Sequence, residues 1–259
     1  MIKYIFSVER NDSIYLFDVL EDIGANDSYR KICQERALTS EIITTLTCDL
    51  TVYRVGSVGE DTVLPGVETD EDILHCEEHF PVIEDISEAY KYKHSFLIVR
   101  ETETPAGYVK LQLVLSNIPR RKIHWHLCND YFVNVLKIDF KSYFTIDRFG
   151  RIVHYDLLSD DNNIPGLFRY KNRPAATLAH KVDMVVGYRC TKWPAMAQEW
   201  RSRHRCNGWP TNEMIDTLKS LGVFVVRKGH LTSQEEDIEW RISFCLQERK
   251  LIFNLTDVQ

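Results

Sequence analysis

Three aspartates stand where their carboxylates could hold a metal ion. Asp70 and Asp72 are one residue apart at the head of an apolar run, and Asp183 lies within the apolar segment KVDMVVGY. On a strand, alternate side chains share a face, so Asp70 and Asp72 are expected to lie together while Glu71 points away. Two carboxylates on one face repel each other unless a cation lies between them. With a third carboxylate from another strand, they form an oxygen-ligand set suited to Mg²⁺ and to phosphoryl transfer.

Each of these acids also has a simpler interpretation. A lone D-x-D pair is more often the polar shoulder of a hairpin, and Asp183 could be an edge-strand aspartate paired with an arginine or lysine. The Gly56-Ser57 step ahead of the acids favours the metal hypothesis, because backbone N–H groups and a hydroxyl at a helical turn bind phosphates. Gly-Ser, D-x-D and a later aspartate, in this order, therefore indicate a nucleotide site.

A second candidate group lies in the segment EWRISFC. Strand alternation assigns its aromatic and aliphatic residues to the core, and Arg241, Ser243 and Cys245 to the other face. That face is equally consistent with recognition of a base or phosphate and with a solvated sheet surface.

Periodicity predicts the elements that position these residues. The first 50 residues favour helices, and short β-branched or aromatic runs punctuated by Gly, Pro and Asp then favour strands. A helix PAMAQEWRSRHR is predicted after Trp193-Pro194, a second one is capped by Thr211, and two strands follow. In the strand GYVKLQLVL, Lys110 is expected to be exposed. This order of elements predicts a mixed α/β or α+β domain.

Composition excludes several classes of protein. The chain has 259 residues, of which 44% are hydrophobic and 27% charged, as in an ordinary globular protein. Its net charge of -6 argues against a surface generally coated by nucleic acid. No signal peptide and no membrane-spanning run is recognisable. The seven cysteines are scattered without a C-x-x-C pair, which favours reduced thiols in the cytoplasm or nucleus over disulfides or structural zinc.

Three stretches resemble the nucleotidyltransferases of the cyclic GMP–AMP synthase-like receptor and Mab-twenty-one (male-abnormal) family. They are GSVGE followed by TDEDIL, then VDMVVGYRCTKWPAMAQEWRSRHRCNGWP, and EWRISFCLQERKL. The resemblance implies an α+β (mixed α/β) fold with a central twisted mixed sheet and flanking helices. It divides the chain into an N-terminal helical spine (1–50), a core with the catalytic acids (51–190), and helices and last strands that begin a C-terminal lobe (191–259). Most of the family's helical lobe is expected to be missing.

The resemblance also implies a role for each matching position. Asp70, Asp72 and Asp183 would bind Mg²⁺ or Mn²⁺ and carry catalysis, with Asp183 helping to deprotonate the attacking hydroxyl. Nucleotide contacts are implied for Gly56, Ser57, Glu60, Lys228, Arg241, Ser243 and Glu248. The implied activity is synthesis of a cyclic dinucleotide from ATP and GTP, as an innate immune response to nucleic acid such as double-stranded RNA. No membrane partner is expected.

Two alternatives remain open. One is a catalytically silent Mab-twenty-one-like scaffold that binds nucleotide or nucleic acid, which the missing helical lobe, Asp61 and Cys245 favour; the NRPA stretch (172–175) also departs from the family pattern. The other is simple nucleic-acid binding by a basic helix end that contains Arg201, Arg203 and Arg205. The same arginines could instead clamp that helix to the sheet.

Overall fold

The computed structural model describes most of the chain. The described residues are 2–22, 26–48, 51–60, 70–155, 167–169, 176–178, 182–203, 208–227, 230 and 233–254. Within these ranges, no helix combines the length and the apolar character needed to cross a membrane.

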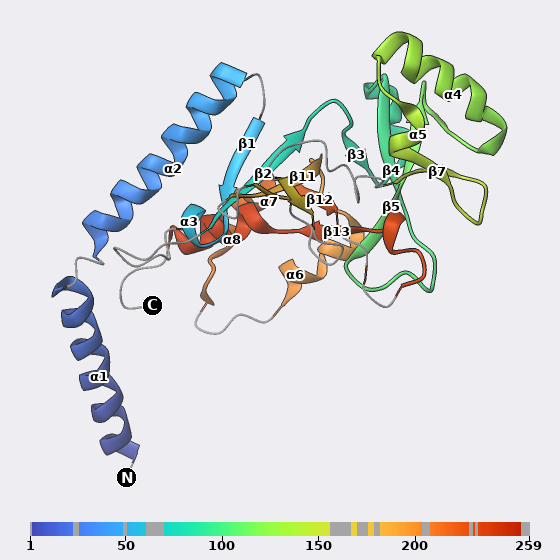
Figure 1. Ribbon diagram of the computed structural model, residues 1–259. Coiled ribbons are helices and arrows are strands. Elements are labelled where there is room, and N and C mark those ends of the chain that lie inside the picture. The colour runs from blue at the N-terminus through green and yellow to red at the C-terminus, as the bar shows by residue number, and fades with distance from the viewer. Residues whose placement is uncertain are drawn as a thin grey trace.

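A curled, mixed sheet forms the centre of the molecule (Figure 1). Its main path runs β1-β2-β11-β12-β13-β5-β4-β3, with β2 parallel to β11 and β3 parallel to β4. The strands of this path are β1 (Thr51–Val55), β2 (Glu71–Glu77), β11 (Val182–Cys190), β12 (Val223–Arg227), β13 (Trp240–Ser243), β5 (Tyr108–Leu115), β4 (His94–Val99) and β3 (Val82–Ile83). Off the path, β10 pairs with β11 and β9, β6 pairs with β5, and β8 pairs with β5 and β7. These strands are β6 (Ile118–Pro119), β7 (Phe144–Ile146), β8 (Ile152–His154), β9 (Leu167–Arg169) and β10 (Ala176–Leu178).

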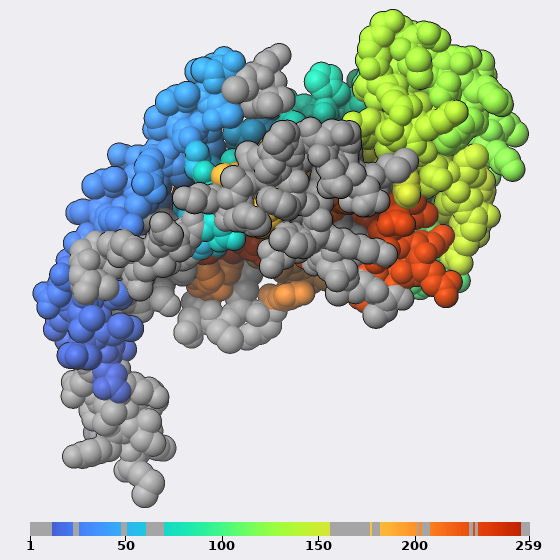
Figure 2. All heavy atoms as spheres, viewed as in Figure 1, coloured from blue at the N-terminus to red at the C-terminus, as the bar shows by residue number. Residues whose placement is uncertain are grey.

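Helices flank both ends of this sheet. α2 runs alongside β1 and lies at the surface in Figure 2, whereas α1 projects away from the body of the molecule (Figure 1). α4 and α5 cover the opposite end, near β4 and β7 (Figure 1). The helices are α1 (Ile2–Asp22), α2 (Asp27–Cys48), α3 (Gly56–Gly59), α4 (Trp125–Tyr131), α5 (Phe140–Tyr143), α6 (Glu199–Ser202), α7 (Asn212–Ser220) and α8 (Cys245–Ile252). Shorter 3-10 or π turns are η1 (Ile86–Lys91), η2 (Lys122–His124), η3 (Phe132–Leu136), η4 (Ala195–Ala197) and η6 (Glu236–Ile238).

The hydrophobic core falls into two main clusters, one on each side of the sheet's centre. The larger cluster is rich in aromatic residues and joins β4, β5, β8 and β13 to the α4–α5 region. The smaller one joins β2 and β12 to α8 through Leu74, Phe224 and Leu246, with Tyr53 of β1 packed against it. Of the acids predicted to be functional, Asp72 lies on β2, which contributes to the smaller cluster, and Asp183 lies on β11, whose Val185 packs against it.

The mixed α/β fold class predicted from the sequence is confirmed, and so is the strand character of the predicted β-branched runs. Thr211 caps α7 as predicted, because its Oγ1 accepts a hydrogen bond from the Met214 N–H at 3.3 Å. Two local predictions are wrong. The helix expected after Pro194 is a 3-10 turn, η4, followed by the short α6. The last strand ends at Ser243, so Cys245 begins α8 instead of continuing the strand face.

Candidate functional site

Asp72 and Asp183 lie side by side on two parallel strands. They are direct partners in the register of β2 and β11, and partners in a parallel pair point to the same side of the sheet. Both side chains are half-buried. Residues separated by more than a hundred positions in the sequence are thus brought into one carboxylate pair by strand pairing.

Asp70 does not share this strand. β2 begins at Glu71, so Asp70 is exposed and precedes it, contrary to the expectation that Asp70 and Asp72 occupy one strand face. The reason lies in β1, which leaves the sheet after Val55, the partner of Asp72, and turns into α3. Glu71 forms an ion pair with Arg54 of β1, as suits a residue that faces away from the acid pair.

The pKa of Asp72 shows that the three aspartates share one electrostatic environment. Burial raises the pKa of the Asp72 carboxyl above its usual value, and the negative charges of Asp70 and Asp183 raise it further. A divalent cation would relieve this repulsion, because an opposite charge nearby favours the ionised form.

Asp183 is oriented by a neighbour that the sequence did not single out. The buried Thr177 of β10 is its partner in the antiparallel register, and the Thr177 hydroxyl donates a 2.6 Å hydrogen bond to Asp183 Oδ1. A hydrogen bond of this kind fixes the rotamer of a ligand or base. Only the cross-strand register reveals Thr177, because nothing in its local sequence marks it.

The turn between β1 and α3 packs directly against Asp72. Gly56 has a φ of +66°, and a Cβ at this position would overlap the Asp72 Oδ2 atom. A Cβ on Gly59 would overlap the Arg54 carbonyl. Glycine is therefore required at both ends of α3, once for its left-handed backbone and once for close packing. Ser57 lies in this turn as predicted, and its phosphate-binding role stays a prediction.

Glu60 belongs to the same acidic neighbourhood. Its backbone N–H donates to the Gly56 carbonyl at 2.8 Å, which places it at the end of α3. Burial raises the pKa of the Glu60 carboxyl, the charges of Glu248 and Asp72 raise it further, and Arg249 opposes them. Arg249 is itself held by an ion pair with Glu41 of α2 and by a 2.7 Å hydrogen bond to the Arg54 carbonyl.

Arg241 and Ser243 lie on β13, two strands away from Asp183. Both are half-buried and alternate with the buried Trp240 and Ile242, as the pattern predicted. β12 separates them from β11, so the described strands do not bring them into the carboxylate pair. Their role as nucleotide contacts stays a prediction, as does that of the exposed Glu248 of α8.

Part of the predicted site lies outside the described residues. This applies to Lys228 and Arg205, and the NRPA stretch at 172–175, which departs from the family pattern, is outside them too. Arg201 falls within α6, and Arg203 is exposed just beyond this helix. The proposed basic helix end therefore stays a prediction.

The carboxylates fit a metal ion in part. Carboxylate oxygens are the donors that Mg²⁺ prefers, and Asp72 with Asp183 would form one side of its ligand sphere. Within the described ranges, however, no three His, Cys, Asp or Glu side chains are grouped so that they could hold a metal ion. The third predicted ligand, Asp70, precedes β2 and does not lie on it.

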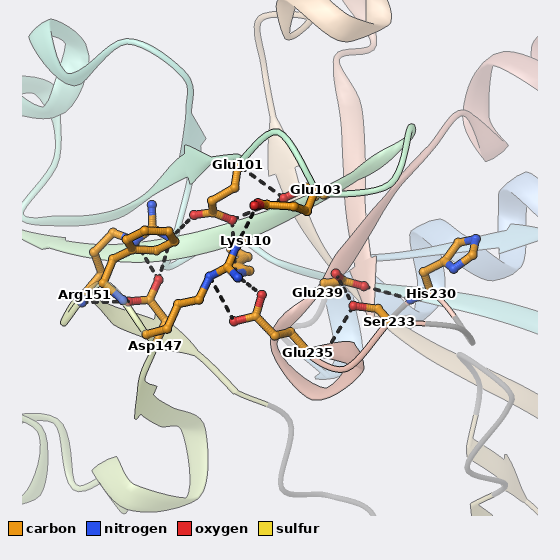
Figure 3. A network of polar contacts seen from close by, with 12 residues as sticks. Glu101, Glu103, Lys110, Asp147, Arg151, His230, Ser233, Glu235 and Glu239 are labelled. Carbon is orange, nitrogen blue, oxygen red and sulfur yellow. Dashed lines mark hydrogen bonds and ion pairs between the residues drawn. The ribbon is translucent and has the colours of Figure 1, made fainter.

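Lys110 is buried, and the prediction that it is exposed is wrong. Its side chain is 1% exposed and forms ion pairs with Glu101 and Glu235 (Figure 3). The local sequence carries no signal of this burial, because Glu235 is 125 residues away and Glu101 lies on the connection from the neighbouring strand. Glu101 follows β4, and Glu235 precedes η6.

A comparison with known protein families gives one match. Residues 154–254 match the model of the Mab-21 protein nucleotidyltransferase domain. The matched span includes Asp183, Arg241, Ser243 and Glu248, and it begins after Gly56 and Asp72. This match agrees with the family expected from the sequence motifs, over residues 154–254.

Proposed function

We propose that this chain is a metal-dependent nucleotidyltransferase of the Mab-21 type, with its reaction centred on Asp72 and Asp183; the match of residues 154–254 to the Mab-21 nucleotidyltransferase model supports this proposal. The observation that carries the proposal is the register of β2 and β11, which sets these two carboxylates beside each other with no room for a side chain on Gly56. Asp70 supplies a further negative charge to the same place.

The proposed chemistry is displacement at a nucleotide α-phosphorus. A ribose hydroxyl oxygen forms the new bond to phosphorus, the bond to the bridging oxygen of the leaving group breaks, and pyrophosphate departs. The Asp183 carboxylate, held by Thr177, accepts the hydroxyl proton and passes it to solvent. Mg²⁺ or Mn²⁺, bound by Asp72 and Asp183 with Asp70, would neutralise charge on the phosphates and on the leaving group.

The finer form of the proposal names the substrates and the product. ATP and GTP are joined into a cyclic dinucleotide in the cytoplasm or nucleus when the protein senses double-stranded nucleic acid. The family resemblance supports this form, with Arg241, Ser243, Glu60, Glu248, Gly56, Ser57 and Lys228 as nucleotide contacts. The exposed Arg203 supports a basic surface for the activating ligand.

Pyrophosphate release tests the proposal. The protein is incubated with ATP, GTP and Mg²⁺ or Mn²⁺, with and without double-stranded RNA or DNA. Asp72→Asn and Asp183→Asn are each expected to lower the rate by roughly a thousandfold. Asp216→Asn, which changes an exposed acid of α7, is the matched control and should retain the wild-type rate. Release that is unchanged in Asp72→Asn would contradict the assignment.

A nucleotide-binding module without turnover is the second candidate. It is favoured by the position of Asp70 outside β2 and by the lack, among the described residues, of a three-ligand group. This candidate predicts Mg²⁺-dependent ATP binding in calorimetry without pyrophosphate in any condition. Binding followed by turnover would exclude it.

A further inference from the structure

Lys110 lies at the centre of a buried chain of charges at the far end of the sheet from Asp72. Its Nζ atom is 2.7 Å from Glu235 Oε2 and 3.1 Å from Glu101 Oε2. An ammonium that is removed from water needs such partners, because burial of an unpaired charge is very costly. Lys110 therefore ties β5 to the two segments that contain Glu101 and Glu235.

The side of this network formed by Glu101 is supported independently of Lys110. Arg151 forms an ion pair with Glu101, and its Nε donates to Asp147 Oδ2 at 2.6 Å (Figure 3). Desolvation acts to raise the pKa of Glu101, but hydrogen bonds from Arg151 and Lys110 outweigh it and lower the pKa. If Lys110 were lost, Glu101 would keep a cation.

Glu235 depends on Lys110 much more than Glu101 does. Apart from Lys110, the cation recorded near Glu235 among the described residues is Arg148, whose Nε lies 4.0 Å from Oε1. Arg148 is half exposed and also bonds Glu103 at 2.8 Å. Lys110 is therefore the principal anchor of the segment that carries Glu235.

That segment connects β12 to β13 and is described at His230 and from Ser233 to Glu239. Its polar groups bond one another. The His230 N–H and the Ser233 hydroxyl both donate to the buried Glu239 carboxylate, at 3.0 and 2.7 Å, and the Glu235 N–H donates to Ser233 Oγ at 3.1 Å. A displacement of Glu235 would thus be transmitted to His230.

His230 lies against β5 beside a residue predicted to contact nucleotide. Its ring meets the Tyr108 ring at 5.3 Å and nearly at a right angle. Tyr108 is the cross-strand partner of Arg241, so the two side chains lie on the same face. Tyr108, His230 and Arg241 therefore lie next to one another. β5 holds this group in place in two ways, through the contact of Tyr108 with His230 and through the ion pair of Lys110 with Glu235.

We propose that Lys110 is a positioning residue. Through Glu235 it fixes the β12–β13 connection so that His230 rests on Tyr108 beside Arg241, and it thereby sets the affinity of the chain for its nucleotide. The effect on affinity rests on the proposed function, whereas the effect on the position of His230 does not.

Glu235→Gln is the variant that tests this inference, because it weakens the anchor and leaves Lys110 paired with Glu101. Glu103→Gln is the matched control: it removes the same charge from an exposed partner of Arg148 that does not touch Lys110. Amide hydrogen exchange at His230 and Glu235 and the nucleotide KM and kcat are measured for both variants.

In Glu235→Gln we expect faster exchange at both amides and a roughly tenfold rise in KM, since a charge-assisted bond is lost. The kcat should stay within about twofold, because the carboxylate pair is untouched. Lys110→Arg, which keeps the charge and a donor for Glu235, should retain wild-type exchange. Glu103→Gln should change neither readout.

Wild-type exchange at His230 in Glu235→Gln would overturn the positioning role. An unchanged KM despite faster exchange would overturn the link to nucleotide affinity. If the wild-type protein binds and turns over no nucleotide, the proposed function fails, and the exchange comparison still decides whether Lys110 positions His230.

Discussion

Buried charges are paired with opposite charges around β5, whereas like charges lie together on β2 and β11. At the β5 end, Lys110 and Arg151 alternate with Glu101, Glu235 and Asp147, so that each carboxylate meets a cation. At the β2–β11 end, Asp72 lies beside Asp183, and the charges that act on Asp72 are all negative. Paired charges hold segments together without a ligand, whereas the repulsion among unpaired carboxylates is relieved by a bound cation or by protonation. The contrast separates the part of the molecule that maintains the architecture from the part suited to bind a cation.

The largest expected effect is at the β5 end. Lys110→Met should lower the free energy of unfolding by roughly 3–5 kcal/mol, because it removes the principal cation of Glu235 and one of the two cations of Glu101 from a buried network. Denaturant unfolding measures the change. Lys91→Met, in which an exposed lysine loses its pairing with Glu88 and its contact with the Tyr90 ring, should cost less than about 1 kcal/mol. Equal losses in the two variants would remove the distinction between the ends.

The pH dependence of stability is the next effect. His154 is fully buried, with Nδ1 2.7 Å from the Tyr143 carbonyl and Nε2 2.7 Å from the Tyr188 hydroxyl, and it stacks on Trp240. Desolvation lowers the pKa of His154 to about 4. Between the unfolded value of about 6.5 and this folded value, the unfolded chain binds more protons. The stability that neutral His154 contributes is fully present above the unfolded pKa. It is lost as the pH falls from there through the folded pKa, by roughly 3 kcal/mol at most.

Unfolding free energies measured from pH 7 down to 4 give the slope of stability against pH. His154→Gln should make this slope smaller, even though the variant is less stable at pH 7. His79→Gln, which changes an exposed histidine, should leave the slope as in the wild type. A slope that persists in His154→Gln would assign the titration to other groups.

The smallest expected effect is a gain in stability at the β2–β11 end. The pKa of Asp72 is raised, so its ionised form is disfavoured by folding, and stability falls as the pH rises through the folded pKa. Asp72→Asn should therefore stabilise the apo protein at pH 7 by up to about 1 kcal/mol, and the advantage should vanish below the unfolded pKa.

Thermal unfolding with and without Mg²⁺ completes this comparison. Mg²⁺ should raise the Tm of the wild type and have a smaller effect on Asp72→Asn, because binding to the native state stabilises it. A destabilised Asp72→Asn variant at pH 7 would show that Asp72 has a partner cation in solution.

Local sequence patterns were sufficient to predict much of the fold. The alternation of Trp240 and Ile242 with Arg241 and Ser243 predicted which β13 side chains are buried, because a strand pointing one face into a core must alternate. The position of Cys245 was missed, since nothing in that alternation indicates where pairing stops and a helix starts.

The candidate site was predictable only in its chemistry. Asp72 and Asp183 could be identified as acids in apolar runs, but their shared register depends on the pairing of distant strands. Lys110 reads as an ordinary exposed lysine until Glu101 and Glu235 are placed beside it. Glu235 is 125 residues from Lys110 in the sequence, so no local pattern indicates that this lysine is paired and buried.

The parallel pairing of β2 with β11 also has a consequence for the order of folding. The whole stretch from β3 to β10 lies between these strands in the sequence, so their pairing is a long-range contact. Long-range strand pairs form late, because the entropy of closing the intervening chain is lost before the contacts are gained. Val55 can pair with Asp72 within a short hairpin-like unit, whereas Asp183 reaches Asp72 only when the rest of the sheet is in place. We therefore expect the repulsion between the two acids to arise late in folding, when most of the core that offsets it has formed.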